Sequence, residues 1–176
     1  MRKPPATAGS SSLDSAAAAT AHYLSPWEST RGGPMPAKMT LDEIHAFLDS
    51  RPGWIALSTI SPSGHPHTVP IGYFRLGEKI YMGCRKGTQK TKNIERNPAV
   101  AVMLESGTTS QDIKGVCIQG TGRVITDPAE ALQLRREAMR RRGVPEDQLP
   151  TEVGPDTAYI EVTPTRYISW DYSKQG

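Results

Sequence analysis

Hydrophobic and polar residues alternate along several short stretches of the chain, with the period of two that is typical of half-buried strands. Gly, Pro, Asn, Asp and Ser separate these stretches, which predict strands at residues 54–60, 67–74, 79–84, 100–104, 115–126 and 158–170. The strands follow one another mostly in hairpin order, so the pattern indicates a mainly β fold with a six-stranded antiparallel barrel. Glycines in the long strand at residues 115–126 predict bulges or a tight bend there, at Gly115, Gly120 and Gly122.

A period near 3.6 residues replaces the alternation in three places, and each has its own start or stop signal. Thr40 and Glu43 form a capping box before an apolar helical face. A short helix from about Gln89 ends before Pro98, because the residue preceding a proline avoids helical geometry. Asp127 caps a third helix, which ends in three arginines and a glycine.

Residues 1–37 show neither period. They are rich in Ala, Ser, Gly and Pro, which predicts a disordered N-terminal tail before a folded domain at residues 38–176. The segment near Arg2 and Lys3 is interrupted by Asp14 and many serines before an apolar region forms, so it does not resemble a signal peptide. Met35 or Met39 would begin the folded domain cleanly.

Composition narrows the class of protein. The 176 residues are 36% hydrophobic and 22% charged, which fits one globular domain. One basic run at residues 135–142 contributes part of the net charge of +3, so the charge gives little support to nucleic-acid binding. No apolar run approaches the roughly 20 residues needed to span a membrane. The two cysteines, Cys84 and Cys117, lie in predicted strands and resemble small core residues, which favours a reducing cytoplasm.

The segment at residues 79–102 carries the clearest chemical signal. A strand runs into a glycine turn and then a short helix whose first turn holds Gln89, Lys90 and Lys92. A helix N-terminus presents unpaired backbone N–H groups and partial positive charge, so a lysine there makes a phosphate site. The alternative interpretation is a solvated basic helix start. The strand–Gly–helix context favours the phosphate site.

Other polar residues carry weaker signals. His65 and His67 flank Pro66, on one face of a predicted strand, but no nearby Cys or carboxylate completes a metal site. His67 is the better proton-donor candidate. Trp170 either covers a ligand or caps the barrel. The run at residues 135–142 is interpreted as a solvated helix face, in preference to a surface that meets the anionic tail of a ligand. No compact Ser-His-Asp or Cys-His group is visible, so nucleophilic hydrolysis is not supported.

Four blocks of sequence follow one another at characteristic spacing: IALSTISPSGHPHTVPIGYF, QKTKNIERNPAVAV, VCIQGTGRV and TRYISWDY. The most specific phrase runs from Lys90 to Pro98, with a Lys-x-x-Asn start and an Asn-Pro end. In this order and spacing the blocks resemble the pyridoxamine-phosphate-oxidase-like split β-barrels, which bind FMN or the deazaflavin coenzyme F420, and the resemblance covers Met39 to Tyr172. The resemblance implies a six-stranded antiparallel split β-barrel with a few short flanking helices, and a homodimer with cofactor sites between subunits.

The resemblance also implies positions for a cofactor site. The lysine matching Lys90 contacts the cofactor phosphate in family members. Residues matching Thr68, Val69 and Pro70 lie along the flavin or deazaflavin ring, largely through backbone groups. Residues at the end of the third strand and the start of the helix line the ribityl and phosphate path, here Gly83, Cys84, Thr88 and Gln89.

Two departures from the oxidases of this family narrow the expected function. Those oxidases carry Arg-Lys where this chain has Gln89-Lys90, and a C-terminal Arg-x-His motif that Arg166-Tyr167-Ile168 does not match. We therefore expect an F420-dependent oxidoreductase that transfers hydride to a small unsaturated or oxidised organic molecule, not a pyridoxamine-phosphate oxidase. The alternatives are an FMN-dependent oxidase or reductase of the same fold, and a non-catalytic flavin- or haem-binding protein.

Overall fold

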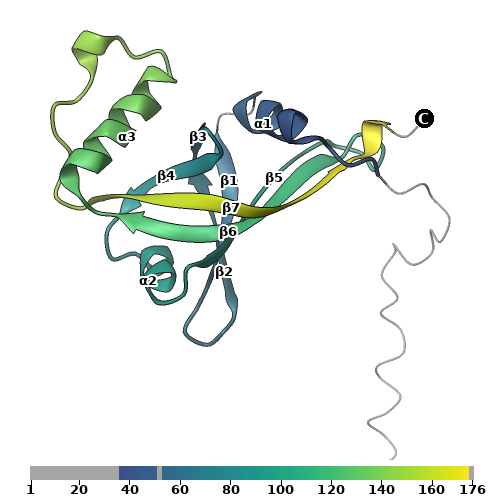
Figure 1. Ribbon diagram of the computed structural model, residues 1–176, viewed down its shortest axis with the longest axis horizontal. Coiled ribbons are helices and arrows are strands. Elements are labelled where there is room, and N and C mark those ends of the chain that lie inside the picture. Colours follow the sequence, from purple (N-terminus) through teal and green to yellow (C-terminus); the bar gives the residue numbers. More distant parts are fainter. Residues whose placement is uncertain (1–35, 51–52, 175–176) are drawn as a thin grey trace, which may run out of the picture. The chain divides into compact units, whose positions relative to one another are not determined.

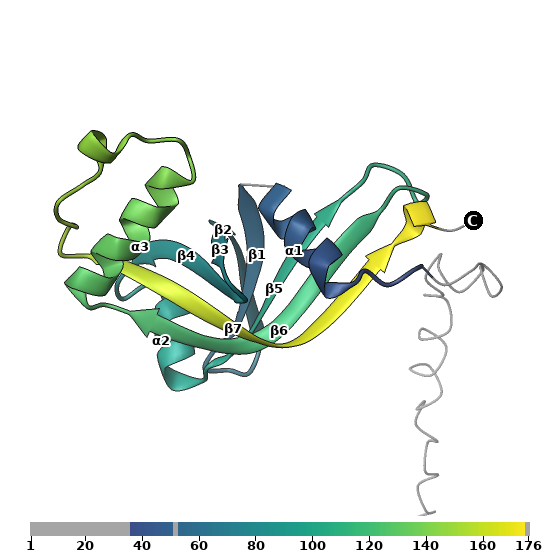
Figure 2. The same cartoon turned by 45° about the horizontal axis from the view of Figure 1, so that its top comes forward.

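A curved antiparallel sheet forms the centre of the computed structural model, which describes residues 36–50 and 53–174 (Figure 1). The sheet contains seven strands in the order β2-β1-β5-β6-β7-β4-β3. It curls into a half-barrel, along which β6 and β7 run side by side (Figure 2). The strands are β1 (Trp54–Ile60), β2 (Pro66–Gly72), β3 (Phe74–Leu76), β4 (Lys79–Arg85), β5 (Ala99–Ser106), β6 (Lys114–Ile125) and β7 (Thr157–Asp171).

The mainly β split-barrel fold predicted from the sequence is confirmed, with one correction to the number of strands. The single strand expected at residues 67–74 is two strands, because the chain leaves β1 and joins β4 at Tyr73. Tyr73 is buried at this crossing, and its hydroxyl donates to the Leu48 carbonyl (2.7 Å). The bulge expected among the glycines lies between Gln119 and Gly120, where the register of β6 and β7 shifts.

The predicted helix caps are present. Helix α1 (Leu41–Ser50) starts with the capping box, since the Thr40 N–H donates to Glu43 Oε2 (2.8 Å) and the Glu43 N–H donates to Thr40 Oγ1 (3.3 Å). Helix α3 (Pro128–Arg140) is capped by Asp127, whose carboxylate accepts from the Glu130 N–H (2.9 Å).

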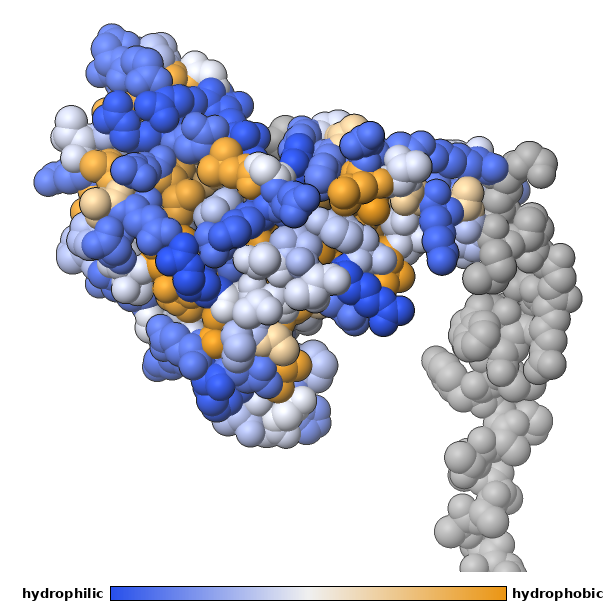
Figure 3. All heavy atoms as spheres, viewed as in Figure 1, coloured by the Kyte–Doolittle hydropathy of each residue, from blue (hydrophilic) through white to orange (hydrophobic). Residues whose placement is uncertain are grey.

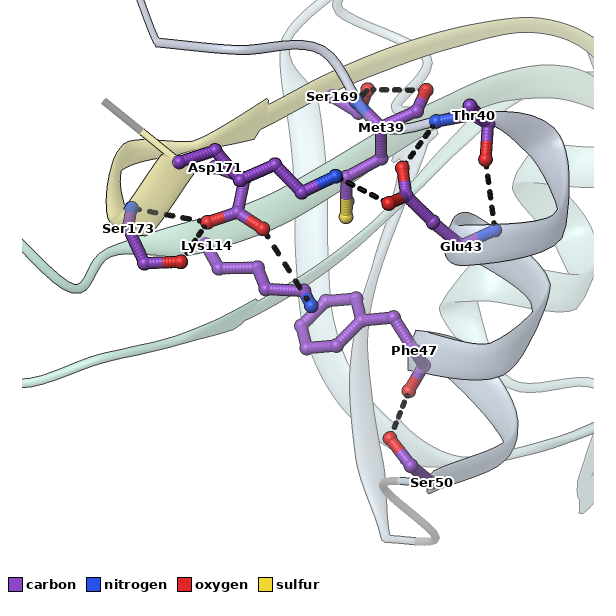
Figure 4. A network of polar contacts seen from close by, with 10 residues as sticks. Met39, Thr40, Glu43, Phe47, Ser50, Lys114, Ser169, Asp171 and Ser173 are labelled. Atoms are coloured by element: carbon purple, nitrogen blue, oxygen red, sulfur yellow. Dashed lines mark hydrogen bonds and ion pairs between the residues drawn. The ribbon is translucent and has the colours of Figure 1, made fainter. Parts of the chain in front are cut away.

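Helix α1 is fastened to the end of the long β6–β7 pair (Figure 4). The Met39 N–H donates to Ser169 Oγ (3.0 Å), and Lys174 forms an ion pair with Glu43. Lys114 lies over the Phe47 ring, 5.2 Å from its centroid, and 3.7 Å from Asp171. These contacts hold the apolar face of α1 on the main core, which fills the inside of the half-barrel.

Helix α3 lies at the other end of β7 and covers a second, smaller core (Figure 1). Ala131 and Leu134 of the helix pack against Ile125 and Tyr159, with Phe74 and Tyr81 beside them. The surface over α3 and the following loop is mostly hydrophilic in Figure 3, with hydrophobic side chains gathered where the helix meets the sheet. The helix is therefore amphipathic, with one apolar side buried and one charged side exposed.

The predicted tail at residues 1–37 lies outside the described residues, except for its last two positions. Of these, Ala37 accepts a hydrogen bond from the Asp171 N–H (2.8 Å). None of the helices in the described part of the chain has the length and apolar character needed to cross a membrane.

Candidate functional site

Helix α2 (Gln89–Arg96) carries the predicted phosphate site and is anchored from two sides. Asn93, which is fully buried, donates to Thr59 Oγ1 on β1 (3.0 Å), and Thr59 in turn donates to the His67 carbonyl on β2 (3.3 Å). Thr88 Oγ1 donates to the Arg85 carbonyl at the end of β4 (3.2 Å). The start of α2 is thus fixed relative to both β2 and β4.

The first turn of α2 keeps its backbone donors available. Thr88 is the N-cap, but its side chain makes no capping hydrogen bond, because its hydroxyl is directed to Arg85 and Thr91. The first backbone N–H of the helix with a partner is that of Lys92, which donates to the Thr88 carbonyl (3.0 Å). The turn contains no acidic residue. Unpaired N–H groups, the helix dipole and a lysine therefore meet at one point.

Lys90 is half-buried and forms no ion pair within the described residues. Its charge acts on Cys84 of β4: burial raises the pKa of the Cys84 thiol, and the charge of Lys90 opposes this shift. The thiol is therefore neutral near pH 7 and is not an activated nucleophile. The structure brings together the predicted residues Cys84, Thr88, Gln89 and Lys90.

A groove of ≈ 780 Å³ begins at Gly83 and Cys84 and extends to α3. Its walls come from the β2–β3 crossing, the end of β4, the start of β7 and the last turns of α3. Trp54, Phe74 and Tyr159 supply aromatic surface, and the charged side chains on its lining are those of Arg85, Arg135, Arg142 and Asp156. The predicted phosphate site thus adjoins a large open groove.

The remaining predicted residues lie elsewhere on the sheet. Thr68 and Pro70 are exposed on the outer face of β2, where Thr68 is hydrogen-bonded to Ser58 (2.8 Å), while Val69 faces inward. β2 is an edge strand of the described sheet, so half of its backbone groups have no strand partner there. Trp170 packs over Gly115, about eleven residues along β7 from Tyr159 or roughly 35 Å of strand. Trp170 therefore lies at the opposite end of β7 from the residues that pair with β4, the strand that leads to Lys90.

The histidines have separate environments. His65 precedes β2 and its Nδ1 is 3.2 Å from Ser63 Oγ, whereas His67 faces inward from β2. The Nδ1 atom of His67 is buried and has no hydrogen-bond partner among the residues that the structure describes, so any proton exchange with a ligand would use Nε2. The described residues contain no group of three or more His, Cys, Asp or Glu side chains able to hold a metal ion.

Sequence reasoning missed two features of the site. It gives Asn93 no role beyond its place in the family phrase, although a polar residue on the buried face of a short helix is a signal for a buried hydrogen bond. It also does not foresee that the Gln89 side chain donates to Asn93 Oδ1 (2.8 Å) and so supports the anchor of α2. That Gln89 lines the phosphate path stays a prediction.

Residues 40–171 match the sequence profile of the pyridoxamine 5'-phosphate oxidase family, which is well over half of the chain. The chain belongs to this family. A comparison with curated proteins finds no match. Among solved structures, a conserved hypothetical protein of Mycobacterium tuberculosis is 22% identical, with a TM-score of 0.67 over 81% of this chain and 91% of that one.

Two further structures have the same fold. An F420 reductase is 26% identical, with a TM-score of 0.54, and the match covers 69% of this chain and 94% of that one. An FAD-binding protein of Mycobacterium smegmatis is 17% identical, with a TM-score of 0.55, and the match covers 76% and 97%. Each match spans most of the other protein's length, so the common unit is the whole barrel.

Proposed function

We propose that this protein is an oxidoreductase that binds a deazaflavin of the F420 type and transfers hydride to a small unsaturated or oxidised organic molecule. The observation that carries the proposal is the first turn of α2, where Lys90 has no ion pair within the described residues and the Thr88 side chain leaves the backbone donors uncapped. A phosphate group fits this donor set. The resemblance to an F420 reductase supports the choice of cofactor.

The residues of this chain would bind and orient the cofactor. Lys90 and the N–H groups of α2 would hold the phosphate, and the free edge of β2 near Val69 offers backbone groups to a planar ring. Gln89 adds no second cation, unlike the Arg-Lys pair of the oxidases. When bound, a reduced deazaflavin supplies a hydride. His67 is the candidate to supply a proton through Nε2, since its Nδ1 is buried.

A titration of the purified protein with F420 and with FMN, followed by absorbance and fluorescence, tests the proposal. We expect tighter binding of F420. Lys90→Ala should weaken binding by about 1.5–3 kcal/mol, roughly 10- to 150-fold, the loss expected for a charge-assisted hydrogen bond. Lys92→Ala is the matched control, because it removes the same charge from an exposed position of the same helix. Tight FMN binding without F420 affinity would refute the cofactor choice, and equal effects of the two variants would refute the phosphate site.

We also propose that the protein is a homodimer, and that a second copy covers the outer face of the sheet. On that face, small and apolar residues lie directly opposite one another across five neighbouring strands, a row roughly 19 Å long. Met103 and Ile168 in it are 38% and 37% exposed. The members of this apolar row are Pro70, Ala56, Met103, Cys117 and Ile168.

Trp170 and Thr68 lie on the same outer face as the apolar row. A cofactor site that included Trp170 together with Lys90 would therefore need the partner subunit. Light scattering after gel filtration tests the dimer: Met103→Glu should give a monomer, because it buries an unpaired charge in the interface. Leu41→Glu, at an exposed apolar position on α1, should leave the dimer intact. A monomeric wild-type protein would contradict the proposal.

A further inference from the structure

The five arginines of α3 and the turn after it separate into those with acidic partners and those without. Arg136, Arg140 and Arg141 form ion pairs with Glu137 and Glu146. Arg135 and Arg142 form none within the described residues. They are seven positions apart, which places them on the same side of a helix. Three arginines of the basic run are thus paired with glutamates, and two keep their charge without an acidic partner among the described residues.

The two free arginines line the groove described above. Arg85, from the end of β4, is a third guanidinium on its lining and likewise has no ion pair among the described residues. Asp156 is the acidic side chain on the lining, so the groove carries an excess of positive charge. Burial raises the pKa of Tyr159, and the charges of Arg135 and Arg142 oppose this shift. Their charges therefore reach the floor of the groove.

The rest of the groove is aromatic and apolar. Trp54 is 73% exposed and adds apolar surface to this lining. Tyr159 is 4% exposed and forms part of the floor, and its ring lies over Gly83, where a Cβ atom would be 3.4 Å from the ring. Flat apolar surface and unpaired guanidinium groups together match a ligand with a flat apolar body and an anionic end.

We propose that this groove binds a flat organic anion, an aromatic or conjugated carboxylate, sulfonate or phosphate. Its apolar body would pack against Trp54, above the floor that Tyr159 forms, and its anionic group would contact Arg135 and Arg142. This binding site is independent of the hydride transfer proposed above. That such anions are the substrate class rests on the proposed function, because the groove begins at Cys84, beside Lys90.

Anilinonaphthalene sulfonate is a suitable fluorescent probe, because it joins an aromatic body to one negative charge. We expect saturable binding that weakens in about 0.5 M salt. The double variant Arg135→Gln/Arg142→Gln should weaken it on the order of tenfold, since two exposed charge contacts are lost. Arg136→Gln/Arg140→Gln removes the same charge from the paired side of the helix, and should leave binding within about twofold of wild type.

Three comparisons complete the test. Uncharged phenylnaphthylamine should bind the wild type and the Arg135→Gln/Arg142→Gln variant equally. Lys90→Ala should keep probe binding while losing cofactor affinity, so that failure of this site and failure of the cofactor site are distinguishable. Displacement of the probe by F420 would show that the groove belongs to the cofactor site and would overturn the proposal, whereas simultaneous binding would support a separate ligand. Equal losses in the two double variants, or no loss in either, would overturn the proposal.

Discussion

Asn93 offers a sharp test of how α2 is held in place. The side chain is fully buried, donates to Thr59 Oγ1 (3.0 Å) and accepts from Gln89 Nε2 (2.8 Å). We predict that Asn93→Ala destabilises the protein and also weakens cofactor binding, although Asn93 lies on the buried side of the helix. The second effect follows because the direction of the first turn of α2 depends on this anchor.

The magnitude follows from the contacts. The two shorter hydrogen bonds, at about 0.5–1.5 kcal/mol each, account for about 1–3 kcal/mol. A third, from Arg96 Nη1 to Asn93 Oδ1, is long (3.5 Å) and adds little. The partners limit any further loss: Thr59 Oγ1 still donates to the His67 carbonyl, and Gln89 is exposed, so its amide can return to water. Removing the amide group also leaves a small cavity, which adds a further loss smaller than the loss from truncating a large core side chain. We therefore expect a loss of about 2–4 kcal/mol for Asn93→Ala, and at most about 1 kcal/mol for Gln89→Ala.

Urea unfolding followed by circular dichroism measures these changes, provided that the slope of the transition stays constant. Thr59→Val keeps the shape of the residue but leaves the Asn93 Nδ2 group buried without its acceptor. This variant should lower the free energy of unfolding by about 1–3 kcal/mol. In the double variant Asn93→Ala/Thr59→Val, the total loss in free energy of unfolding should be about 1 kcal/mol smaller than the sum of the two single losses. A loss below about 0.5 kcal/mol for Asn93→Ala, or strict additivity, would refute this account of the anchor.

Two further predictions concern the long strands. A Cβ atom on Gly120 would overlap the Thr163 carbonyl oxygen of β7, so Gly120→Ala should destabilise the protein by about 1–3 kcal/mol in urea unfolding. Gly154→Ala is the control and should change the stability little, because a Cβ atom there would make only an ordinary contact with Thr157. Burial raises the pKa of Glu161, but hydrogen bonds from Arg123 and two neighbours outweigh it, so the folded-state pKa lies below the ordinary 4.5. Glu161 thus stabilises the fold above about pH 4.5, and Glu161→Gln should differ from wild type at pH 7 by an amount that shrinks as the pH falls through the folded-state pKa. A pH-independent difference would contradict this.

Those parts of the fold that depend on local signals are predictable from the sequence. The capping box at Thr40 and the cap at Asp127 are contacts within one helical turn, so short motifs define them. The division of a strand at Tyr73 is not predictable in this way, because alternation continues through the crossing and only tertiary pairing with β4 separates β3 from β2. The bulge at Gly120 is predictable because a glycine inside a strand often marks a bulge or the close approach of another backbone.

The candidate site shows the same limit at the level of side chains. Sequence reasoning identifies Lys90, since the strand–Gly–helix order places a lysine at a helix N-terminus regardless of the rest of the fold. It interprets residues 135–142 as a solvated face. For Arg136 and Arg140 this interpretation agrees with the structure, because both form surface ion pairs with Glu146. The free side of α3 depends on where the helix lies against β4 and on the position of Glu146, which follows the helix and neutralises one side alone. Spacing shows that Arg135 and Arg142 share a side, but only packing shows that this side faces a groove.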